Sequence, residues 1–344
     1  MVDLVLHPGH SKCGSTTIQN FLYKNKEKFQ NRGVFFPDLN FNFPCHEDYQ
    51  FHLTHTPRDY LAKVQSGEVA IEVLSKKIDD LLAHAEDMGC RRVIVSAENL
   101  INGISGGITS SIHQLFSEKF NNVRIVYYVR KQDALMLSAW QQWGHKEGIS
   151  LDDYVAKLMN TKFADFDFVA RHLKRFYPNG SLNVFPIEKA HLVDQCLLSD
   201  FCTRAAINKK NLNFDLEPSN EGISSALCDS LTKVHGIYPN QHDQNIKNTL
   251  IEFASHSSKI LNKKYKVDLS FNIRKELFER FHESNERLAK KFFPNVSFEE
   301  TMSLLSLKSH SEDELEFLKC RVEKLEDLTA IQMDLILNLI KKGI

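Results

Sequence analysis

The sequence predicts an α/β protein in which a parallel sheet is flanked by helices and the C-terminal part is mostly helical. Three observations predict this fold class. Short apolar runs, typical of strands buried on both faces, alternate with segments of helical periodicity in the first half of the chain. The 344 residues, of which 42% are hydrophobic, are enough to bury a large core. From about residue 190 onward, helical patterns predominate.

The first half of the chain contains four predicted strands. They are, in chain order, Val2–Leu6, Arg92–Ser96, Val123–Val129 and Leu182–Pro186. Apolar residues at helical spacing predict the segments between them to be helices, and these are Thr16–Phe29, Ile71–Met88 and Gln132–Glu147. Residues 34–60 contain turn formers, aromatic residues and histidines, and we expect them to form a long loop.

The last thirty residues have a heptad-like apolar pattern. A 3-4-3 spacing at Leu315, Leu318, Val322 and Leu325 is followed, after a phase shift, by Leu328, Ile331, Leu335 and Leu339. The pattern predicts either a coiled coil that joins subunits into a homo-oligomer or a terminal helix packed on its own domain, and the sequence leaves both open. We expect a principal domain at residues 1–300 and a C-terminal helix at 305–344.

Composition limits the classes of function. The formal net charge of −1 gives no support for nucleic-acid binding, so any anion site must be local. The seven cysteines are an odd number and form no C-x-x-C pair, which suits a reducing compartment. We find neither a signal peptide nor an apolar run long enough to span a bilayer. The sequence therefore predicts a cytoplasmic protein with no integral membrane segment.

The first predicted strand leads into a glycine-bearing loop and then a helix, in the stretch HPGHSKCGSTT at residues 7–17. The free N–H groups and the positive end of a helix N-terminus form an anion site, and Gly9 and Gly14 permit the turns that it needs. The spacing nearly matches the phosphate-binding loop G-x-x-x-x-G-K-[ST], which predicts a P-loop-like fold. The lysine, however, lies inside the turn, at Lys12.

Three hydroxyl residues, Ser15, Thr16 and Thr17, open the helix that follows. A plain helix cap needs only one hydroxyl, so three of them beside a lysine favour an anion site over simple capping. Ser15 stands where a nucleoside triphosphatase has its lysine. The loop alone does not distinguish ATP from other phosphates.

Two further strands end in polar residues. Ser96 and Glu98 follow the second predicted strand, and Arg130 follows the third, with Ser138 eight residues later. Because the carboxyl ends of parallel strands meet at the edge where α/β proteins bind ligands, these residues are candidates for an active site. An arginine there can bind phosphate, and a glutamate can act as a general base. Taken singly, each also has an ordinary structural interpretation, as a helix cap or a surface residue.

Three histidines, His46, His52 and His55, lie in the predicted loop at residues 34–60. We expect them to contact a substrate, and one of them is a rival for the role of catalytic base. Their spacing matches no strong zinc pattern, so no metal is expected.

In combination, these motifs resemble the PAPS-dependent sulfotransferases, and among them the bacterial sulfotransferase-like proteins that modify glycans. The matching stretches are KCGSTTIQ at residues 12–19, SAE at 96–98, VRKQ at 129–132, PSNEGIS at 218–224 and FHESNERLAKKFF at 281–293. The matching stretches are scattered over residues 2–293, and the tail after about residue 305 lies outside the resemblance. The sequence departs from the usual pattern at Ser11 and Cys13, where the family has proline and a hydroxyl residue, and the resemblance leaves the adenine contacts unassigned.

The resemblance implies a role for each candidate residue. Lys12, Cys13, Gly14, Ser15, Thr16 and Thr17 would bind PAPS, the last four at its 5′-phosphate, and Arg130 and Ser138 would bind its 3′-phosphate. Lys12 would also stabilise charge on the bridging oxygen, and Glu98 would accept the proton of an acceptor hydroxyl. The acceptor implied is a saccharide or glycolipid, and no metal is required.

Two other classes of function remain open from the sequence. A P-loop kinase or nucleoside triphosphatase would require the lysine that position 15 lacks, and a strand ending in aspartate that we do not find. A nonenzymatic protein could retain the nucleotide fold and use its C-terminal helix as an interaction arm.

Overall fold

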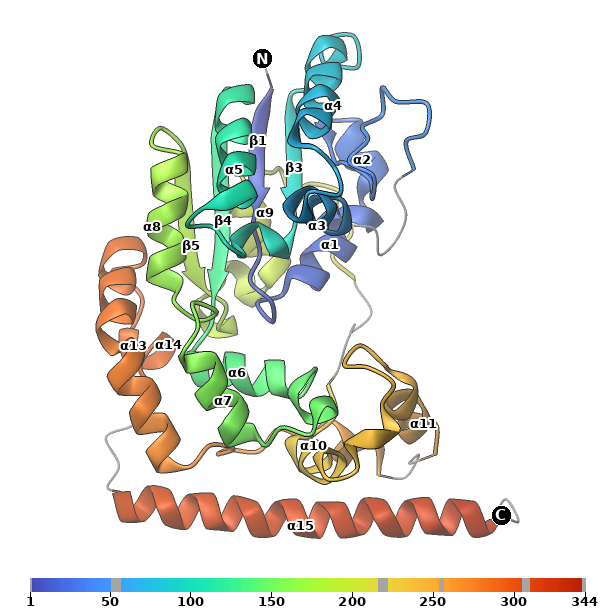
Figure 1. Cartoon of the computed structure of the whole chain (residues 1–344), viewed down its shortest axis with the longest axis vertical. Coiled ribbons are helices and arrows are strands. Elements are labelled where there is room, and N and C mark those ends of the chain that lie inside the picture. The colour runs from blue at the N-terminus through green and yellow to red at the C-terminus, as the bar shows by residue number, and fades with distance from the viewer. Residues whose placement is uncertain (1, 51–56, 216–221, 254–256, 305–309, 342–344) are drawn as a thin grey trace. The chain divides into compact units, whose positions relative to one another are not determined.

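The computed structural model describes residues 2–50, 57–215, 222–253, 257–304 and 310–341, and it confirms the α/β fold (Figure 1). Its centre is a five-stranded, all-parallel sheet in the order β2-β3-β1-β4-β5. The strands are β1 (Asp3–His7), β2 (Val34–Phe35), β3 (Arg92–Ser96), β4 (Val123–Val129) and β5 (Ser181–Pro186).

The three inner strands form the core because their side chains are apolar on both faces. In β1 and in β3, every residue except the first is buried, and in β4 six of the seven residues are buried. The predicted bounds of β3 and β4 are confirmed, whereas β1 begins and ends one residue later than predicted. In register, His7 lies opposite Ser96, so β1 and β3 end side by side.

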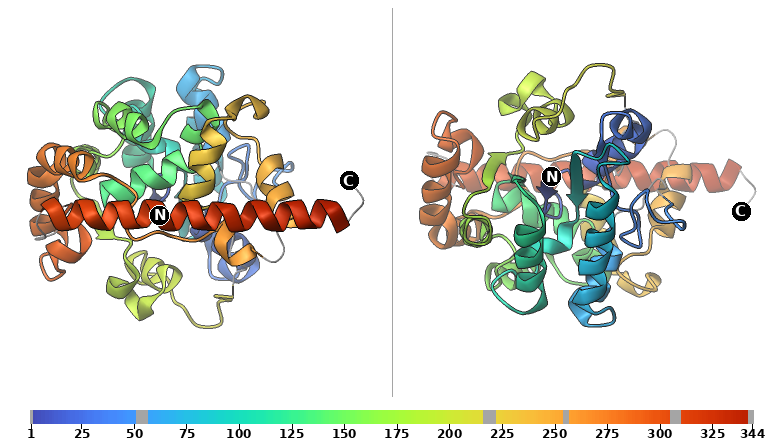
Figure 2. Two further views of the ribbon diagram at one scale, coloured as in Figure 1. Left: turned by 90° about the horizontal axis from the view of Figure 1, so that it is seen from below. Right: turned by 90° about the horizontal axis from the view of Figure 1, so that it is seen from above.

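The chain divides into two compact units, and the first contains the sheet. It consists of Met1–Arg130, Phe166–Ser219 and Glu286–Thr301. Helices α4 (Ile71–His84), α5 (Gly107–Lys119) and α8 (Phe166–Phe176) cover one face of the sheet, and α1 (Ser15–Lys24) and α9 (Leu197–Arg204) cover the other (Figure 2). Its other helices are α2 (Lys26–Gln30), α3 (Arg58–Ser66) and α14 (Phe298–Thr301).

The second unit is helical, and it consists of Lys131–Asp165, Asn220–Asn285 and Met302–Ile344. Its helices are α6 (Gln132–Trp140), α7 (Leu151–Met159), α10 (Ser225–Thr232), α11 (Asn245–Phe253), α12 (Ser258–Leu261) and α15 (His310–Lys341). Helix α13 (Phe271–Phe292) runs from this unit into the first. Among the described residues, no helix combines the length and the apolar content needed to cross a membrane. The expected division into residues 1–300 and 305–344 stays a prediction.

The structure corrects four expectations about individual elements. The helix predicted at Ile71–Met88 ends at His84. The helix predicted at Thr16–Phe29 is broken at Asn25, whose side chain donates to the carbonyl oxygens of Phe21 and Asn213. The loop predicted at residues 34–60 contains β2 and the first residues of α3. The helix predicted to extend from Gln132 ends at Trp140 and is followed by a short 3₁₀ turn. At Asn25, a polar side chain that bonds to the backbone accompanies the break, and apolar periodicity does not reveal such a bond.

Candidate functional site

The loop after β1 is built around left-handed backbone conformations. Gly9, Lys12 and Gly14 have φ angles of 62°, 67° and 80°. The N–H of Cys13 donates to the carbonyl oxygen of His10 (3.0 Å), which closes the turn. A non-glycine residue in this region costs roughly 1–3 kcal/mol, so Lys12 is held in a strained conformation by the rest of the loop. The strain falls on the residue that the sequence singled out for catalysis.

Helix α1 begins without a side-chain cap. Its N-cap residue is Gly14, and no side chain accepts a hydrogen bond at that position. The hydroxyls of Ser15, Thr16 and Thr17 therefore do not cap the helix in the usual way, which was the structural alternative for this motif. Thr16 is exposed, Thr17 half-buried and Ser15 buried. The helix start thus offers backbone donors, positive dipole charge and two accessible hydroxyls to an anion.

The end of β3 packs directly against this loop. The hydroxyl of Ser15 donates to Oε1 of Glu98, and Nε2 of Gln19 lies 3.3 Å from Oγ of Ser96. A Cβ atom on Gly9 would lie 3.1 Å from both Cα and Cγ of Glu98, so only glycine permits this approach without displacement. The structure therefore brings Glu98 to the loop, and it joins the motif at residues 12–19 to the motif at 96–98.

His7 completes the junction between the two strands. Its Nδ1 lies 2.8 Å from Oγ of Ser96, and burial lowers the pKa of His7 to about 4. The imidazole is consequently neutral at physiological pH. Since Ser96 also contacts Gln19, its hydroxyl links β1, β3 and α1 and fixes the base of the loop. Neither His7 nor Gln19 has a role that was predicted from the sequence.

Arg130, directly after β4, reaches the same loop. Its Nη1 donates to the carbonyl oxygen of Lys12 (3.2 Å), which helps to hold the left-handed residue in place. Ser138, which the resemblance pairs with Arg130, lies on α6 in the second unit. Its contact with a 3′-phosphate stays a prediction.

Within the second unit, two resemblance motifs are joined by a buried amide pair. Nε2 of Gln132 donates to Oδ1 of Asn285 (2.8 Å), and Nδ2 of Asn285 donates back to Oε1 of Gln132 (2.9 Å). Both residues are buried, so these side chains have a structural role in the motifs at residues 129–132 and 281–293.

Cys13 is a buried thiol of the loop on which four charged side chains act. Burial raises the pKa of its thiol to about 12, and the charges that act on it are those of Arg130, Glu188, Glu98 and Lys12. The thiol is therefore neutral and unsuited to nucleophilic chemistry. Because its N–H is bonded within the turn, the loop offers an anion its donors from Gly14 onward.

Glu188 is a charged residue near the loop that was not predicted from the sequence. It lies two residues beyond the end of β5, and its charge acts on Cys13 together with that of Arg130. The signal was present in the sequence, since an acidic residue soon after a predicted strand is the same pattern that identified Glu98. Polar residues thus follow four of the parallel strands, β1, β3, β4 and β5, at the same edge of the sheet.

The position of the loop fits the place where α/β sheets bind ligands. Strand β1 lies between β3 and β4, yet the helix that follows it covers one face, while the helix after β3 covers the other (Figure 2). A crevice opens at such a switch point, outside the carboxyl ends of the strands. The contact of Ser15 with Glu98 lies at this point.

His46 lies elsewhere in the first unit. It lines a cavity of about 220 Å³ together with Cys45, Lys77, Asp80 and His84. No residue of the loop between β1 and α1 lines this cavity. Because His84 ends α4, which leads toward the start of β3, the cavity lies away from the carboxyl edge. His52 and His55 are outside the described residues. Contact of the three histidines with a substrate stays a prediction.

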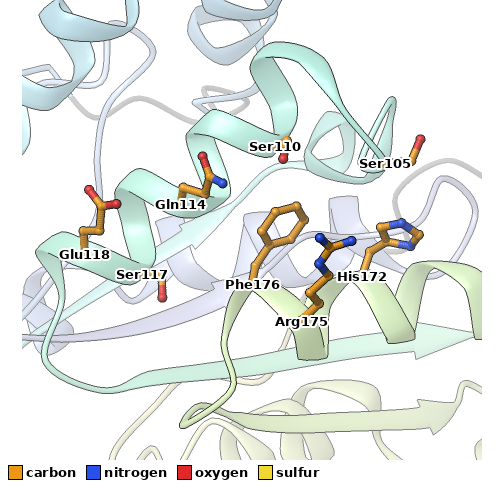
Figure 3. Close-up of a pocket in the computed structure, with 8 residues that line it drawn as sticks. All are labelled: Ser105, Ser110, Gln114, Ser117, Glu118, His172, Arg175 and Phe176. Carbon is orange, nitrogen blue, oxygen red and sulfur yellow. The ribbon is translucent and has the colours of Figure 1, made fainter.

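A second cavity, of about 290 Å³, lies between α5 and α8 (Figure 3). Its walls include Ser110, Gln114 and Ser117 of α5, and His172, Arg175 and Phe176 of α8. None of the sequence-predicted site residues lines it, so we assign it no part in the candidate site. Within the described part of the chain, no group of three or more histidine, cysteine or acidic side chains could hold a metal ion.

Comparison with protein-family models and with curated proteins finds no match for this chain. The functional assignment therefore depends on the motifs and on the geometry of the loop.

Proposed function

We propose that this protein is a PAPS-dependent sulfotransferase that transfers a sulfuryl group to the hydroxyl of an acceptor. The observation that carries the proposal is the contact network at the carboxyl edge of the sheet. There, the Arg130 guanidinium donates to the backbone carbonyl of the strained loop residue Lys12, and the Ser15 hydroxyl at the start of α1 donates to Glu98. An anion-binding loop, a cation inside it and a carboxylate beside it are the groups that this reaction needs.

The loop fits the 5′-phosphate end of such a donor. Gly14 places α1 with uncapped N–H groups, and the hydroxyls of Thr16 and Thr17 stand at its first turn. Arg130 lies one strand away from this helix start, and in the proposal its guanidinium binds the 3′-phosphate together with Ser138. PAPS would supply the sulfuryl group, with adenosine 3′,5′-bisphosphate as the leaving group.

The chain's own residues then have separate roles. Lys12 would offset the charge that develops on the bridging oxygen as the bond between sulfur and that oxygen breaks. Glu98 would orient the acceptor hydroxyl and take its proton as the new oxygen–sulfur bond forms. Both roles require a rigid support, which Arg130 provides for the Lys12 backbone and Ser15 for Glu98.

The remaining parts of the proposal rest on the resemblance and on composition. We propose a saccharide or glycolipid as the acceptor. All seven cysteines are free, which is compatible with a reducing cytoplasm. We also include self-association through the C-terminal helix in this proposal.

Calorimetry with nonreactive nucleotides tests the assignment. The protein should bind adenosine 3′,5′-bisphosphate more tightly than AMP, because only the former carries the phosphate assigned to Arg130. A charged hydrogen bond contributes roughly 1.5–3 kcal/mol, so Arg130→Gln should weaken bisphosphate binding about tenfold or more. Its affinity for AMP should change little.

Arg124→Gln is the matched control. Arg124 lies on the same strand, and its guanidinium donates to the carbonyl oxygen of Arg204 instead of the loop. This variant should bind both nucleotides as the wild type does. If Arg130→Gln weakens AMP and bisphosphate equally, Arg130 only supports the loop. Equal wild-type affinities for the two nucleotides would refute the 3′-phosphate assignment.

A further inference from the structure

One face of helix α15 is apolar and exposed to solvent. Leu315, Leu318, Val322 and Leu325 are 54%, 51%, 56% and 63% exposed. The same heptad positions continue along the helix at Thr329, Gln332, Ile336 and Leu339, and each of these residues is exposed. Among the described residues of this unit, none covers this stripe, which extends over most of the 32-residue helix. A stripe of this length and regularity is unusual on a helix with no partner.

The opposite face of α15 packs on its own unit. Ile331 and Cys320 are buried there, Nζ of Lys324 lies 2.7 Å from a carboxylate oxygen of Asp268, and the Tyr265 hydroxyl donates to Asp327 (2.9 Å). The two alternatives that the sequence left open therefore describe two faces of one helix. The apparent phase shift arises because Ile331 belongs to the buried face, while the exposed a and d positions continue in the same heptad register, with the polar residues Thr329 and Gln332 between the two apolar parts.

We propose that α15 pairs with α15 of a second copy of this chain as a parallel, in-register, two-stranded coiled coil. The inference makes the proposed self-association specific and does not depend on the sulfotransferase assignment. In heptad terms, the a positions are Leu315, Val322, Thr329 and Ile336, and the d positions are Leu318, Leu325, Gln332 and Leu339. β-Branched residues at a with leucine at d favour two parallel strands.

The charges beside the stripe favour the same orientation. Glu314 and Arg321 occupy g positions, Lys319 and Glu326 occupy e positions, and all four are exposed. In a parallel pair, each g residue faces the e residue five positions later on the second helix. Glu314 then meets Lys319, and Arg321 meets Glu326, so both pairs are of opposite charge. An antiparallel pair that superposes the leucine-rich halves would instead place Lys319 against Lys319.

The polar layer fixes the register. Thr329 and Gln332 interrupt the apolar stripe, and in-register pairing places each opposite its own copy, where their polar groups can bond to each other. A membrane surface is a poorer occupant for this stripe, because acidic residues outnumber basic ones in α15 and anionic lipids attract basic helices.

Sedimentation equilibrium of the full-length chain tests the interface. The wild type should be a dimer, and Leu318→Ser combined with Leu325→Ser should raise the dimer dissociation constant by about a hundredfold or more. Both side chains are exposed within the unit, so thermal unfolding of the diluted variant should stay near that of the wild type. Ile251→Ser is the matched control, because Ile251 on α11 is 52% exposed but lies outside the stripe. It should remain dimeric.

Cysteine cross-linking tests the orientation and the register. In a parallel, in-register pair, Thr329→Cys places two thiols in one layer and should give an intermolecular disulfide on mild oxidation. Ala330→Cys, one residue away and also exposed, points outward from the seam and should not. A dimer in which Thr329→Cys fails to cross-link would overturn the parallel register.

Other outcomes also decide the proposal. A wild-type chain that stays monomeric at high concentration, or a trimer, would overturn it. The proposal would also be overturned if the chain formed no dimer in solution but bound vesicles of anionic lipid, and if the Leu318→Ser and Leu325→Ser changes abolished that binding. None of these results bears on nucleotide binding, so the failure of either proposal can be recognised separately.

Discussion

Gly14 offers the most direct physical test of how the loop is built. Its φ angle is 80°, and a Cβ atom there would overlap Cδ2 of Leu197 and lie 3.2 Å from Cδ1 of Ile187. Gly67, which ends α3, has nearly the same φ angle, 81°, with nothing within 4 Å of an added Cβ. The two glycines therefore separate the cost of the backbone conformation from the cost of the overlap.

The expected losses of stability follow from these two costs. Alanine in the left-handed region costs roughly 1–2 kcal/mol, which is the whole expected effect of Gly67→Ala. Overpacking adds roughly 1 kcal/mol, the low end of its usual range, because the overlapping atom is the terminal methyl of the half-buried Leu197, so Gly14→Ala should lower the free energy of unfolding by about 2–3 kcal/mol in total. Leu197→Ala removes the overlapping atom, so it should restore the stability that Gly14→Ala loses through overpacking, but not the part lost through the left-handed backbone conformation.

Urea denaturation measures these losses of stability as shifts in the unfolding midpoint at constant m. It is applied to four variants, which are Gly14→Ala, Gly67→Ala, Leu197→Ala and the double variant Gly14→Ala with Leu197→Ala. The coupling between Gly14 and Leu197 should be favourable by about 1 kcal/mol or more. If Gly14→Ala costs no more than Gly67→Ala, or if Leu197→Ala gives no rescue, the loop does not require glycine for close packing.

The remaining predictions concern protonation and catalysis. His113 donates from Nε2 to the carbonyl oxygen of Leu100 and accepts from the Tyr177 hydroxyl at Nδ1, and burial lowers its pKa from 6.5 to about 4. Between these two pKa values the unfolded state binds more protons than the folded state. The contribution of His113 to the free energy of unfolding should therefore be complete above pH 6.5 and fall by at most about 3 kcal/mol toward pH 4. Urea titrations at several pH values should show a weaker pH dependence of stability for His113→Gln. Glu98→Gln keeps an oxygen for Ser15 but cannot take a proton, so turnover should drop about 10²–10⁴-fold while bisphosphate affinity persists; normal turnover would exclude Glu98 as base. Lys12→Met should slow transfer about 10²–10³-fold, and an equal loss of calorimetric affinity would make Lys12 only an anchor.

The sequence predicted the sheet well because its strands are buried on both faces. Continuous apolar runs gave the bounds of β3 and β4, since no other element of that length fits a fully buried position. Strand β2 was not predicted, because a strand of two residues is too short to show an apolar pattern. The break at Asn25 was also missed, because it depends on a bond to Asn213, far away in the chain.

The candidate site was predictable in composition but not in contacts. Polar residues after predicted strands identified Glu98 and Arg130, and the same rule applied to β5 would have found Glu188. The contact between Ser15 and Glu98 could not be read from the sequence, because 83 positions separate them and only the parallel pairing of β1 with β3 brings them together. The left-handed conformation of Lys12 was likewise hidden, since it is imposed by the loop.

Transfer of labelled sulfate tests the central claim most directly. The protein should move label from ³⁵S-labelled PAPS to a saccharide or glycolipid in a panel of glycans, without added Mg²⁺, and the Lys12→Met variant should transfer far less while still binding the bisphosphate. Failure to transfer label to any acceptor, together with Mg²⁺-dependent hydrolysis of ATP, would contradict the account and identify the loop as that of a nucleoside triphosphatase.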